Sequence, residues 1–332
     1  MKNCVVGFGS ALVDILISES DEFLQQTGIR KGGMSLTDEP SLQRVLANTT
    51  QLPVIVPGGS ACNTTIGVAR LGGRARFVGK LGNGGMGKLF ENGLIRDGVD
   101  PHLRRSKTKT GRVVSVITPD AQRSMLTFLG AAAEIEPNEI DNACLQDAAI
   151  AHIEGYLCHQ PDLIRHIHQL AVQSGARVSL DLASYTVIEA HRPLIDELLQ
   201  KGVDILIANE DEAESFTGVS DEIEALRIMS RCARIAVYKM GKRGSLIASG
   251  NEIMAIEARG NGDAVDTTGA GDLWASGFLF GLANGYSVQQ AGTLASCCGH
   301  EVCQIVGAKI PEHGWMRIRN SMKDIELAIP DR

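Results

Sequence analysis

The chain has 332 residues, 44% of them hydrophobic, and its 32 Lys and Arg against 39 Asp and Glu give a net charge of −7. This acidic balance disfavours nucleic acid as a partner, because nucleic-acid binders usually carry a basic surface that attracts phosphates. Charged residues interrupt every apolar stretch before the length of about 18 residues that a membrane-spanning helix needs, so we expect no membrane segment and a small molecule as the partner.

The N-terminus and the cysteines indicate a reducing compartment. Residues 1–7 lead directly into a strand-like segment without the apolar region of a secretory signal, so we expect a cytoplasmic protein. The eight cysteines form no CxxC pair and no zinc-type spacing. Cys297, Cys298 and Cys303 together with His300 could be interpreted as metal ligands, but we favour simple packing in an apolar helix.

Strand-like runs alternate with helical patterns along most of the chain. The clearest strands span residues 4–9, 75–79, 149–154, 177–181, 204–208 and 235–239. Helical patterns span residues 60–71, 86–96, 162–174, 194–200 and 222–232. This alternation is typical of a parallel sheet covered by helices. No linker or internal repeat marks a boundary, so we expect one domain over residues 1–332.

A different pattern occupies residues 110–129. Two β-prone runs flank the turn-forming residues Pro119-Asp120-Ala121-Gln122, which predicts a hairpin. Together with residues 11–18 and 34–37, this hairpin could form a second, small sheet that projects from the main body. We expect these three segments to act as a lid.

Two glycine-rich loops come close to nucleotide-binding motifs. The first, which starts at Gly7, has Leu12 where a dinucleotide fingerprint has its third glycine, and a strand-like run follows where a helix is required. The second, residues 82–89, is one residue short of a Walker A loop and has Leu89 in place of the Mg²⁺-binding hydroxyl. We favour structural turns for both, and an enzyme that uses either loop, with Lys88 in the second, is the less favoured alternative.

A third loop, Asp-Thr-Thr-Gly-Ala-Gly-Asp at residues 266–272, precedes a strongly apolar helical run. Small residues at a helix start leave the first N–H groups free to bind an anion. Asp272 could accept a proton from a hydroxyl while those N–H groups hold a phosphoryl group. On spacing alone, an acidic residue that only caps its helix explains the pattern equally well.

Residues 266–272 also resemble the D-T-x-G-A-G-D signature of the ribokinase-like (PfkB) carbohydrate kinase family. Further motifs of that family occur in its order: Gly9-Ser10-Ala11-Leu12-Val13-Asp14, Gly58-Gly59-Ser60-Ala61-Cys62-Asn63, the N-x-x-E motif at residues 209–212 and the G-x-x-G motif at residues 241–244. The resemblance implies a three-layer αβα fold with a mostly parallel central sheet and a small β lid. It also implies transfer of the γ-phosphoryl group of Mg·ATP to a hydroxyl of a sugar or nucleoside.

The resemblance assigns roles to individual residues. It makes Asp272 the general base and the backbone of Gly269, Ala270 and Gly271 the anion hole. It places the acceptor against Asp14, Gly58, Gly59, Asn63 and, by similarity to the lid of adenosine kinases, Arg123. It assigns the nucleotide to Asn209, Gly241, Gly244, Thr268 and Gly307, and Mg²⁺, held through water, to Asn209 and Glu212. Several relatives use a monovalent cation such as K⁺, for which Asp266 and Thr268 are the candidates, and many form homodimers through the lid.

The acceptor stays open at this stage. A nucleoside site would need an aromatic residue to stack on the base, and Phe128 is the best-placed candidate. The basic run of Arg104, Arg105, Lys107, Lys109 and Arg112 would suit a sugar phosphate, although such runs are usually solvated. Adenosine kinase, sugar-phosphate kinase and a non-catalytic ligand sensor on the same fold are therefore the alternatives. The chain also departs from the family pattern, with Gly82-Asn83-Gly84-Gly85 in place of a Gly-Asp-Asp sequence and Lys239-Met240-Gly241 in place of Thr-Leu-Gly.

Overall fold

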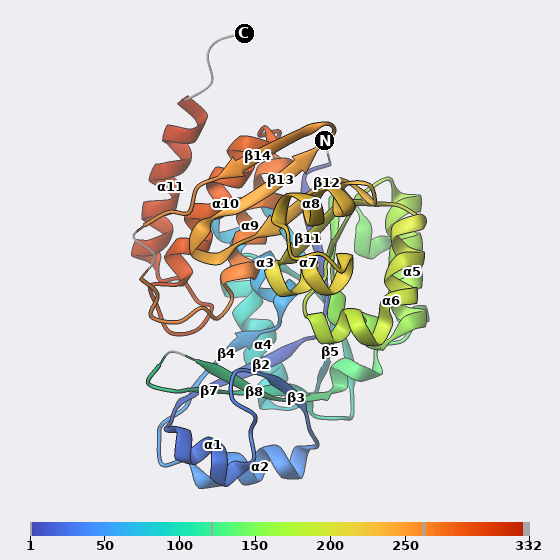
Figure 1. The fold of residues 1–332 in the computed structure, drawn as a ribbon. Coiled ribbons are helices and arrows are strands. Elements are labelled where there is room, and N and C mark those ends of the chain that lie inside the picture. The colour runs from blue at the N-terminus through green and yellow to red at the C-terminus, as the bar shows by residue number, and fades with distance from the viewer. Residues whose placement is uncertain (1, 121, 261–262, 328–332) are drawn as a thin grey trace.

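The computed structural model describes residues 2–120, 122–260 and 263–327, and its centre is a nine-stranded sheet (Figure 1). The order in the sheet is β14 (Glu252–Ile256), β13 (Ser245–Ser249), β12 (Ala233–Lys239), β11 (Val203–Asn209), β10 (Arg177–Asp181), β9 (Ala148–Glu154), β1 (Cys4–Phe8), β5 (Arg74–Gly82) and β6 (Asp100–Ser106). The strands from β12 to β6 run parallel to one another, whereas β13 is antiparallel to both of its neighbours, β12 and β14.

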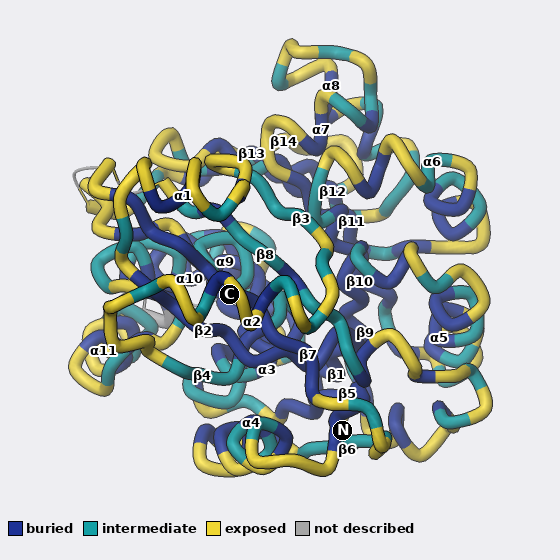
Figure 2. The backbone as a smooth tube through the Cα atoms, turned by 90° about the horizontal axis from the view of Figure 1, so that it is seen from below, coloured by how far each residue is buried: buried dark blue, intermediate teal, exposed yellow. Residues whose placement is uncertain are grey.

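Helices cover both faces of this sheet because successive strand residues point to opposite sides. Val6 packs into one core and its neighbour Val5 into the other. The first core is closed by α5 (Pro161–Ser174), α6 (Tyr185–Gln200), α7 (Glu210–Thr217) and α8 (Glu222–Ser230). The second is closed by α3 (Ser60–Arg70), α4 (Gly85–Arg96), α9 (Ala270–Ala283), α10 (Val288–Val302) and α11 (Glu312–Leu327). The three-layer αβα fold is therefore confirmed, with the sheet buried between its helices (Figure 2).

A second, five-stranded sheet lies below the main body in Figure 1. Its order is β3 (Met34–Leu36), β8 (Arg123–Gly130), β7 (Thr110–Ile117), β2 (Leu12–Ser18) and β4 (Val54–Gly58). Two helices, α1 (Asp21–Thr27) and α2 (Glu39–Asn48), bury the outer face of this smaller sheet with a small apolar core. Its inner face, which includes Leu12, Val113 and Met125, is turned toward the main body and lines a cavity described below.

Some elements differ from the expectation. The smaller sheet contains β4 as well as the three predicted segments, and neither α1 nor α2 was predicted. Helix α6 spans Tyr185–Gln200, but His191, with φ of −129°, is not helical and divides it into two parts. The predicted helix at residues 194–200 matches the second part, which begins beside Pro193, and the first part was not predicted. The predicted turn at residues 119–122 includes residue 121, which lies outside the described residues.

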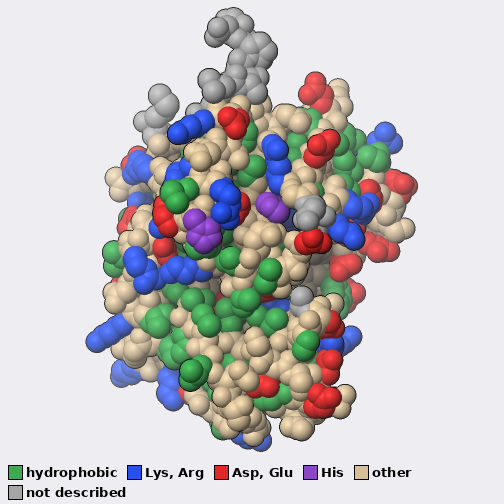
Figure 3. Space-filling view, turned by 90° about the vertical axis from the view of Figure 1, so that its left-hand side faces the viewer, with side chains coloured by type: hydrophobic (Ala, Val, Ile, Leu, Met, Phe, Trp, Pro, Cys, Tyr) green, Lys and Arg blue, Asp and Glu red, His purple; other side chains and the backbone are tan. Residues whose placement is uncertain are grey.

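The described residues also show the character of the helices, of one face of the surface and of the cysteines. In the part of the chain that the structure describes, no helix is both long and apolar enough to span a bilayer. Basic and acidic side chains are interspersed on the face shown in Figure 3, without a broad basic field. Cys297 and Cys298 are buried in the second core, and no three potential metal ligands cluster among the described residues. These cysteines therefore contribute to packing.

Candidate active site

Two cavities meet at the start of α9, where most of the motif residues converge. The glycine cavity, of about 570 Å³, is lined by Gly241, Gly244, Gly271 and Gly299 among others. The carboxylate cavity, of about 410 Å³, lies between the main sheet and the smaller sheet and is lined by Asp14, Glu154, Asp181, Glu212 and Asp272 among others. Five residues line both cavities: Asn209, Lys239, Thr267, Ala270 and Gly271. These five residues therefore lie at the boundary between the two cavities.

The start of α9 presents free backbone donors at this junction. Gly269 adopts the left-handed conformation, with φ of 74°, and turns the chain into the helix. Among the described residues, the N–H groups of Gly269, Gly271 and Asp272 have no acceptor, whereas that of Ala270 donates to the Thr267 carbonyl at 3.1 Å. Free N–H groups at a helix N-terminus form a site for an anion. Two of the three predicted anion-hole donors, Gly269 and Gly271, are thus available.

Asp272 stands in the first turn of α9 and is held by α3. Its Oδ1 accepts a hydrogen bond from the Ser60 hydroxyl at 2.7 Å and its Oδ2 one from the Asn63 amide at 2.9 Å. Burial raises the pKa of Asp272, and these two hydrogen bonds oppose the rise. The result is a fixed carboxylate that binds a proton more readily than an exposed one.

Asp14 faces Asp272 across the carboxylate cavity from strand β2. Its side chain is only 9% exposed, and no donor among the described residues hydrogen-bonds to it. Burial raises its pKa to about 7, with the nearby Arg123 guanidinium opposing the rise. Gly58 lies behind it, where an added Cβ would stand 2.2 Å from the carboxyl carbon of Asp14. Gly58 therefore does not line the cavity as predicted but makes room for Asp14.

Glu154, at the end of β9, was not singled out from the sequence. Its two oxygens accept hydrogen bonds from the backbone N–H groups of Ser10, at 2.7 Å, and Ala61, at 3.0 Å. Burial raises its pKa to about 7. Gly9 admits this carboxylate, since an added Cβ there would lie 2.3 Å from it. Glu154 thus links the segment just before β2, which carries Asp14, to the first turn of α3, which carries Asn63.

Asn209 and Glu212 form the reciprocal cap of α7. The Asn209 side chain accepts from the Glu212 N–H at 2.9 Å, and the Glu212 carboxylate accepts from the Asn209 N–H at 2.8 Å and from its amide at 2.7 Å. Glu212 is 4% exposed, and burial raises its pKa to about 7. Because both side chains also line the carboxylate cavity, their oxygens are suited to Mg²⁺ through its water ligands.

Asp266 organises the segment before α9. Its Oδ1 accepts from the N–H and hydroxyl of Thr268, at 2.9 and 2.7 Å, and its Oδ2 accepts from the Gly307 N–H at 2.8 Å. Thr268 and Gly307, predicted as nucleotide ligands, therefore bind this buried carboxylate, and neither lines the glycine cavity. Their contacts fix the loop that ends in the anion hole.

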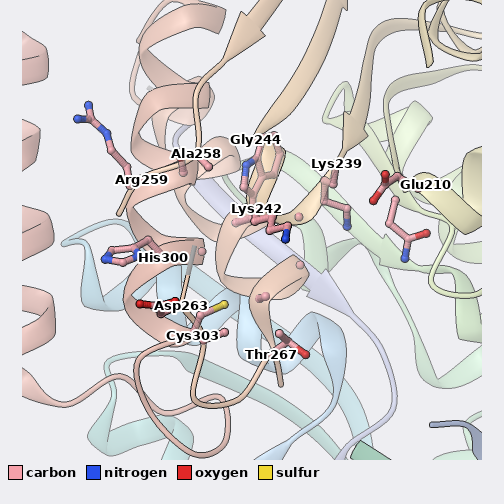
Figure 4. Close-up of a pocket in the computed structure, with 18 of the residues that line it drawn as sticks. Glu210, Lys239, Lys242, Gly244, Ala258, Arg259, Asp263, Thr267, His300 and Cys303 are labelled. Carbon is pink, nitrogen blue, oxygen red and sulfur yellow. The ribbon is translucent and has the colours of Figure 1, made fainter. Parts of the chain in front are cut away.

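The glycine cavity is lined by glycines together with charged side chains, among them Lys242 and Arg259 (Figure 4). A short 3₁₀ turn, η5 (Gly241–Arg243), brings Gly241, with φ of 53°, and Gly244, with φ of 90°, to its wall, as predicted for the nucleotide. Across the cavity lie Trp274, His300 and Cys303 from α9 and α10. Small residues facing larger apolar ones leave room for a flat ring with a phosphate chain.

The smaller sheet contributes Arg123 to the carboxylate cavity but not Phe128. Side chains alternate across β8, so Phe128 points to the outer face, where it packs in the core under α1 and α2 and stacks with Arg112. The interpretation of Phe128 as a base-stacking residue is therefore wrong. None of the five residues of the predicted basic run lines the cavity, and four of them pair with acidic groups: Arg104, Arg105, Lys109 and Arg112.

Comparison with known proteins shows the family of this chain. A model of the pfkB family carbohydrate kinases matches residues 37–313. The chain belongs to this family. It is therefore a phosphotransferase that acts on a hydroxyl group, a sugar or nucleoside kinase with the ribokinase-like fold.

Individual pfkB relatives differ in their acceptors. The structure is similar to that of an adenosine kinase from Sinorhizobium meliloti, with a TM-score of 0.91, 31% identity and coverage of 97% of this chain and 100% of that chain. It is equally similar to a probable sugar kinase from Rhizobium etli, with a TM-score of 0.91, 32% identity and coverage of 98% and 99%. A probable fructokinase from Arabidopsis thaliana is 25% identical over 90% of both chains. The family therefore establishes the class of reaction, whereas the acceptor differs among its members.

Proposed function

We propose that this protein is a nucleoside kinase, which transfers the γ-phosphoryl group of Mg·ATP to a ribose hydroxyl. The observation that carries the proposal is the mixed polar and apolar lining of the carboxylate cavity. Asp272, on α9, and Asp14, on β2 of the smaller sheet, supply carboxylate acceptors. The inner face of the smaller sheet adds apolar side chains beside the polar Ser115, Arg123 and Thr127. A ribose with an attached base has the same division into a polar and an apolar part.

The apolar side chains that line the cavity favour a nucleoside over a free sugar. Four strands of the smaller sheet contribute them: Leu12, Met34, Val113, Met125 and Leu129. A free sugar carries hydroxyls around its whole ring, and hydroxyls that are buried without partners cost free energy. A planar base loses little on contact with apolar side chains. The basic run that would suit a sugar phosphate lies outside this cavity, which disfavours that acceptor.

Asp14 is suited to hold a diol. Its carboxylate is buried, accepts no hydrogen bond from the described residues and faces the cavity, so two hydroxyls can donate to it. A site built in this way rejects analogues that lack the hydroxyl, because the buried acceptor then stays unpaired. We expect 2′- or 3′-deoxynucleosides to be poor acceptors.

Asp272 acts as the general base in this proposal. It accepts the proton of the attacking hydroxyl, while Ser60 and Asn63 hold its carboxylate in place. The free N–H groups of Gly269 and Gly271 receive the charge that develops on the transferred group. ATP lies along the glycine cavity, and Mg²⁺, held through water near Asn209 and Glu212, neutralises phosphate charge when bound. Closure of the smaller sheet over the acceptor excludes water.

The test is ADP release from Mg·ATP with a panel of nucleosides, deoxynucleosides, free sugars and sugar phosphates. We expect activity with one or more nucleosides, and a loss of about 10²–10⁴-fold in kcat for Asp272→Asn, with ATP affinity retained. Asp162→Asn is the matched control, since that side chain is 93% exposed in α5. Activity with free sugars alone would replace the nucleoside by a sugar. No activity with any acceptor would favour a ligand sensor.

Two further expectations stay predictions. The smaller sheet ends in β3 and β4, whose outer edges have no strand neighbour among the described residues, so a homodimer could pair through them. Light scattering at several concentrations tests this.

A K⁺ site near Asp266 and Thr268 predicts faster turnover in KCl than in choline chloride. The same kinase assay measures this difference.

A further inference from the structure

Lys239 occupies the junction of the two cavities. It is the last residue of β12, and its side chain is 13% exposed and turned toward the turn at the start of α9 (Figure 4). Its Nζ lies 3.0 Å from Oδ2 of Asp181, at the end of β10. Few side chains line both cavities, and Lys239 is the one among them that carries a positive charge. The family pattern has a threonine here.

The amine lies next to the anion hole. A Cβ added to Gly271 would stand 3.1 Å from the Lys239 Nζ, so the amine lies close to Gly271, whose N–H has no acceptor among the described residues. An ammonium group and a free N–H at one place provide two donors of positive potential for the same oxygen atoms.

The surroundings keep this lysine charged. Burial alone would lower its pKa, but the carboxylates of Asp181 and Glu212 outweigh burial and raise the pKa of Lys239. His152 lies on β9, the strand next to the one that carries Asp181. It is buried and hydrogen-bonded to Ser179 at 3.1 Å, and burial lowers its pKa to about 4. This neutral histidine does not compete with Lys239 for Asp181.

We propose that Lys239 is a catalytic residue of this kinase, which contacts the transferred phosphoryl group, and that Asp181 is the residue that positions it. This proposal rests on the proposed function. In the step, the acceptor oxygen forms a bond to the γ-phosphorus as the bond to the β–γ bridging oxygen breaks. The hydroxyl proton goes to Asp272, ADP carries away the bonding electron pair, and Lys239 keeps its own proton throughout.

The role predicts a specific kinetic change. Lys239→Met removes the charge and keeps the length, and we expect kcat to fall by about 10²–10³-fold with little change in the acceptor KM. Lys239→Arg keeps the charge and should be faster than Lys239→Met. Lys80→Met is the matched control, because Lys80 has a similarly buried side chain, pairs with Glu139 at 2.7 Å and lines neither cavity. It should lose stability but not kcat.

Binding gives a second readout that needs no acceptor. If Lys239 contacts the γ-phosphoryl group, Lys239→Met should weaken a non-hydrolysable ATP analogue about tenfold or more in calorimetry and leave ADP affinity nearly unchanged. Should the single variant fail to fold, the double variant Asp181→Asn/Lys239→Met avoids an unpaired buried carboxylate and serves for the same comparison. Asp181→Asn alone should lower kcat less than Lys239→Met, without raising the acceptor KM.

The outcomes separate the two proposals. Wild-type kcat in Lys239→Met, or equal losses of affinity for ADP and the triphosphate analogue, would overturn the role of Lys239. Lys239→Arg no faster than Lys239→Met would also count against a role that depends on charge. If the wild-type protein phosphorylates no acceptor, the proposed function fails, while the calorimetric comparison still decides whether Lys239 contacts the γ-phosphoryl group.

Discussion

The two cavities are built in different ways. The wall of the glycine cavity includes glycines with positive φ, such as Gly241 and Gly244, which let a ligand approach the backbone closely, beside charged side chains such as Lys242. The carboxylate cavity relies on buried acidic side chains and on a separate sheet. Backbone recognition suits the phosphates that every acceptor reaction shares. Side chains on a second sheet can change without disturbing that machinery, so under the proposed function we expect the carboxylate cavity to determine acceptor specificity.

Asp14→Asn should produce the largest difference between the effect on the acceptor and the effect on ATP. Loss of the charged acceptor should lower kcat/KM for the acceptor by about 10²-fold, because hydrogen bonds to a charged group are worth about 1.5–3 kcal/mol each. ATP affinity should stay at the wild-type value, since Asp14 does not line the glycine cavity. Initial-rate kinetics with each substrate varied in turn make the measurement. An equal loss for ATP would show that the two cavities are not independent.

The same variant should be more stable than the wild type at high pH. Burial raises the pKa of Asp14 to about 7, above its unfolded value near 4. This group therefore contributes most to stability below about pH 4, and the contribution is lost as pH rises to 7. Asp14→Asn lacks that loss, so its Tm should exceed the wild-type Tm by a few degrees at pH 8 and not at pH 4. Thermal unfolding at both pH values tests the sign.

Gly58→Ala should change the carboxylate cavity by displacing the Asp14 side chain. The new Cβ would collide with the Asp14 carboxyl group and push it toward the acceptor, so we expect the acceptor KM to rise about 10-fold. Gly85→Ala is the matched control, since a Cβ at that helix start meets no atom within 4 Å. An unchanged acceptor KM in Gly58→Ala would mean that Asp14 does not bind the acceptor.

Sequence patterns predicted most of the main body, although β6, β13 and β14 of its sheet were not among the predicted strands. The six predicted strands and four of the five helices match within a few residues, because buried parallel strands are short apolar runs and their helices are strongly periodic. The predicted motif residues Asp272, Asn63 and Asp14 also meet in one cavity. Each of these predictions rests on a local pattern or on a motif with fixed spacing.

Features that depend on distant contacts were not predictable in this way. Glu154 looks like an ordinary acid at a strand end until the fold brings Ser10 and Ala61 to it. Lys239 was noted only as a departure from the family pattern, and Asp181, its partner, is 58 residues away. The face that Phe128 occupies depends on the register of β8 against β7, which the sequence of one strand does not reveal.

The smallest effect should come from two adjacent residues of β8 that face opposite ways. Leu129 lines the carboxylate cavity, whereas Phe128 packs under α1 and α2. Leu129→Ala should raise the KM for a nucleoside a few-fold through lost contact with the base, and change Tm little. Phe128→Ala should lower Tm through lost packing and leave the nucleoside KM unchanged. The opposite assignment would place the base on the outer face of the smaller sheet. A Leu129→Ala KM equal to that of the wild type would remove the apolar wall from the argument for a nucleoside, because that argument requires this wall to contact the base.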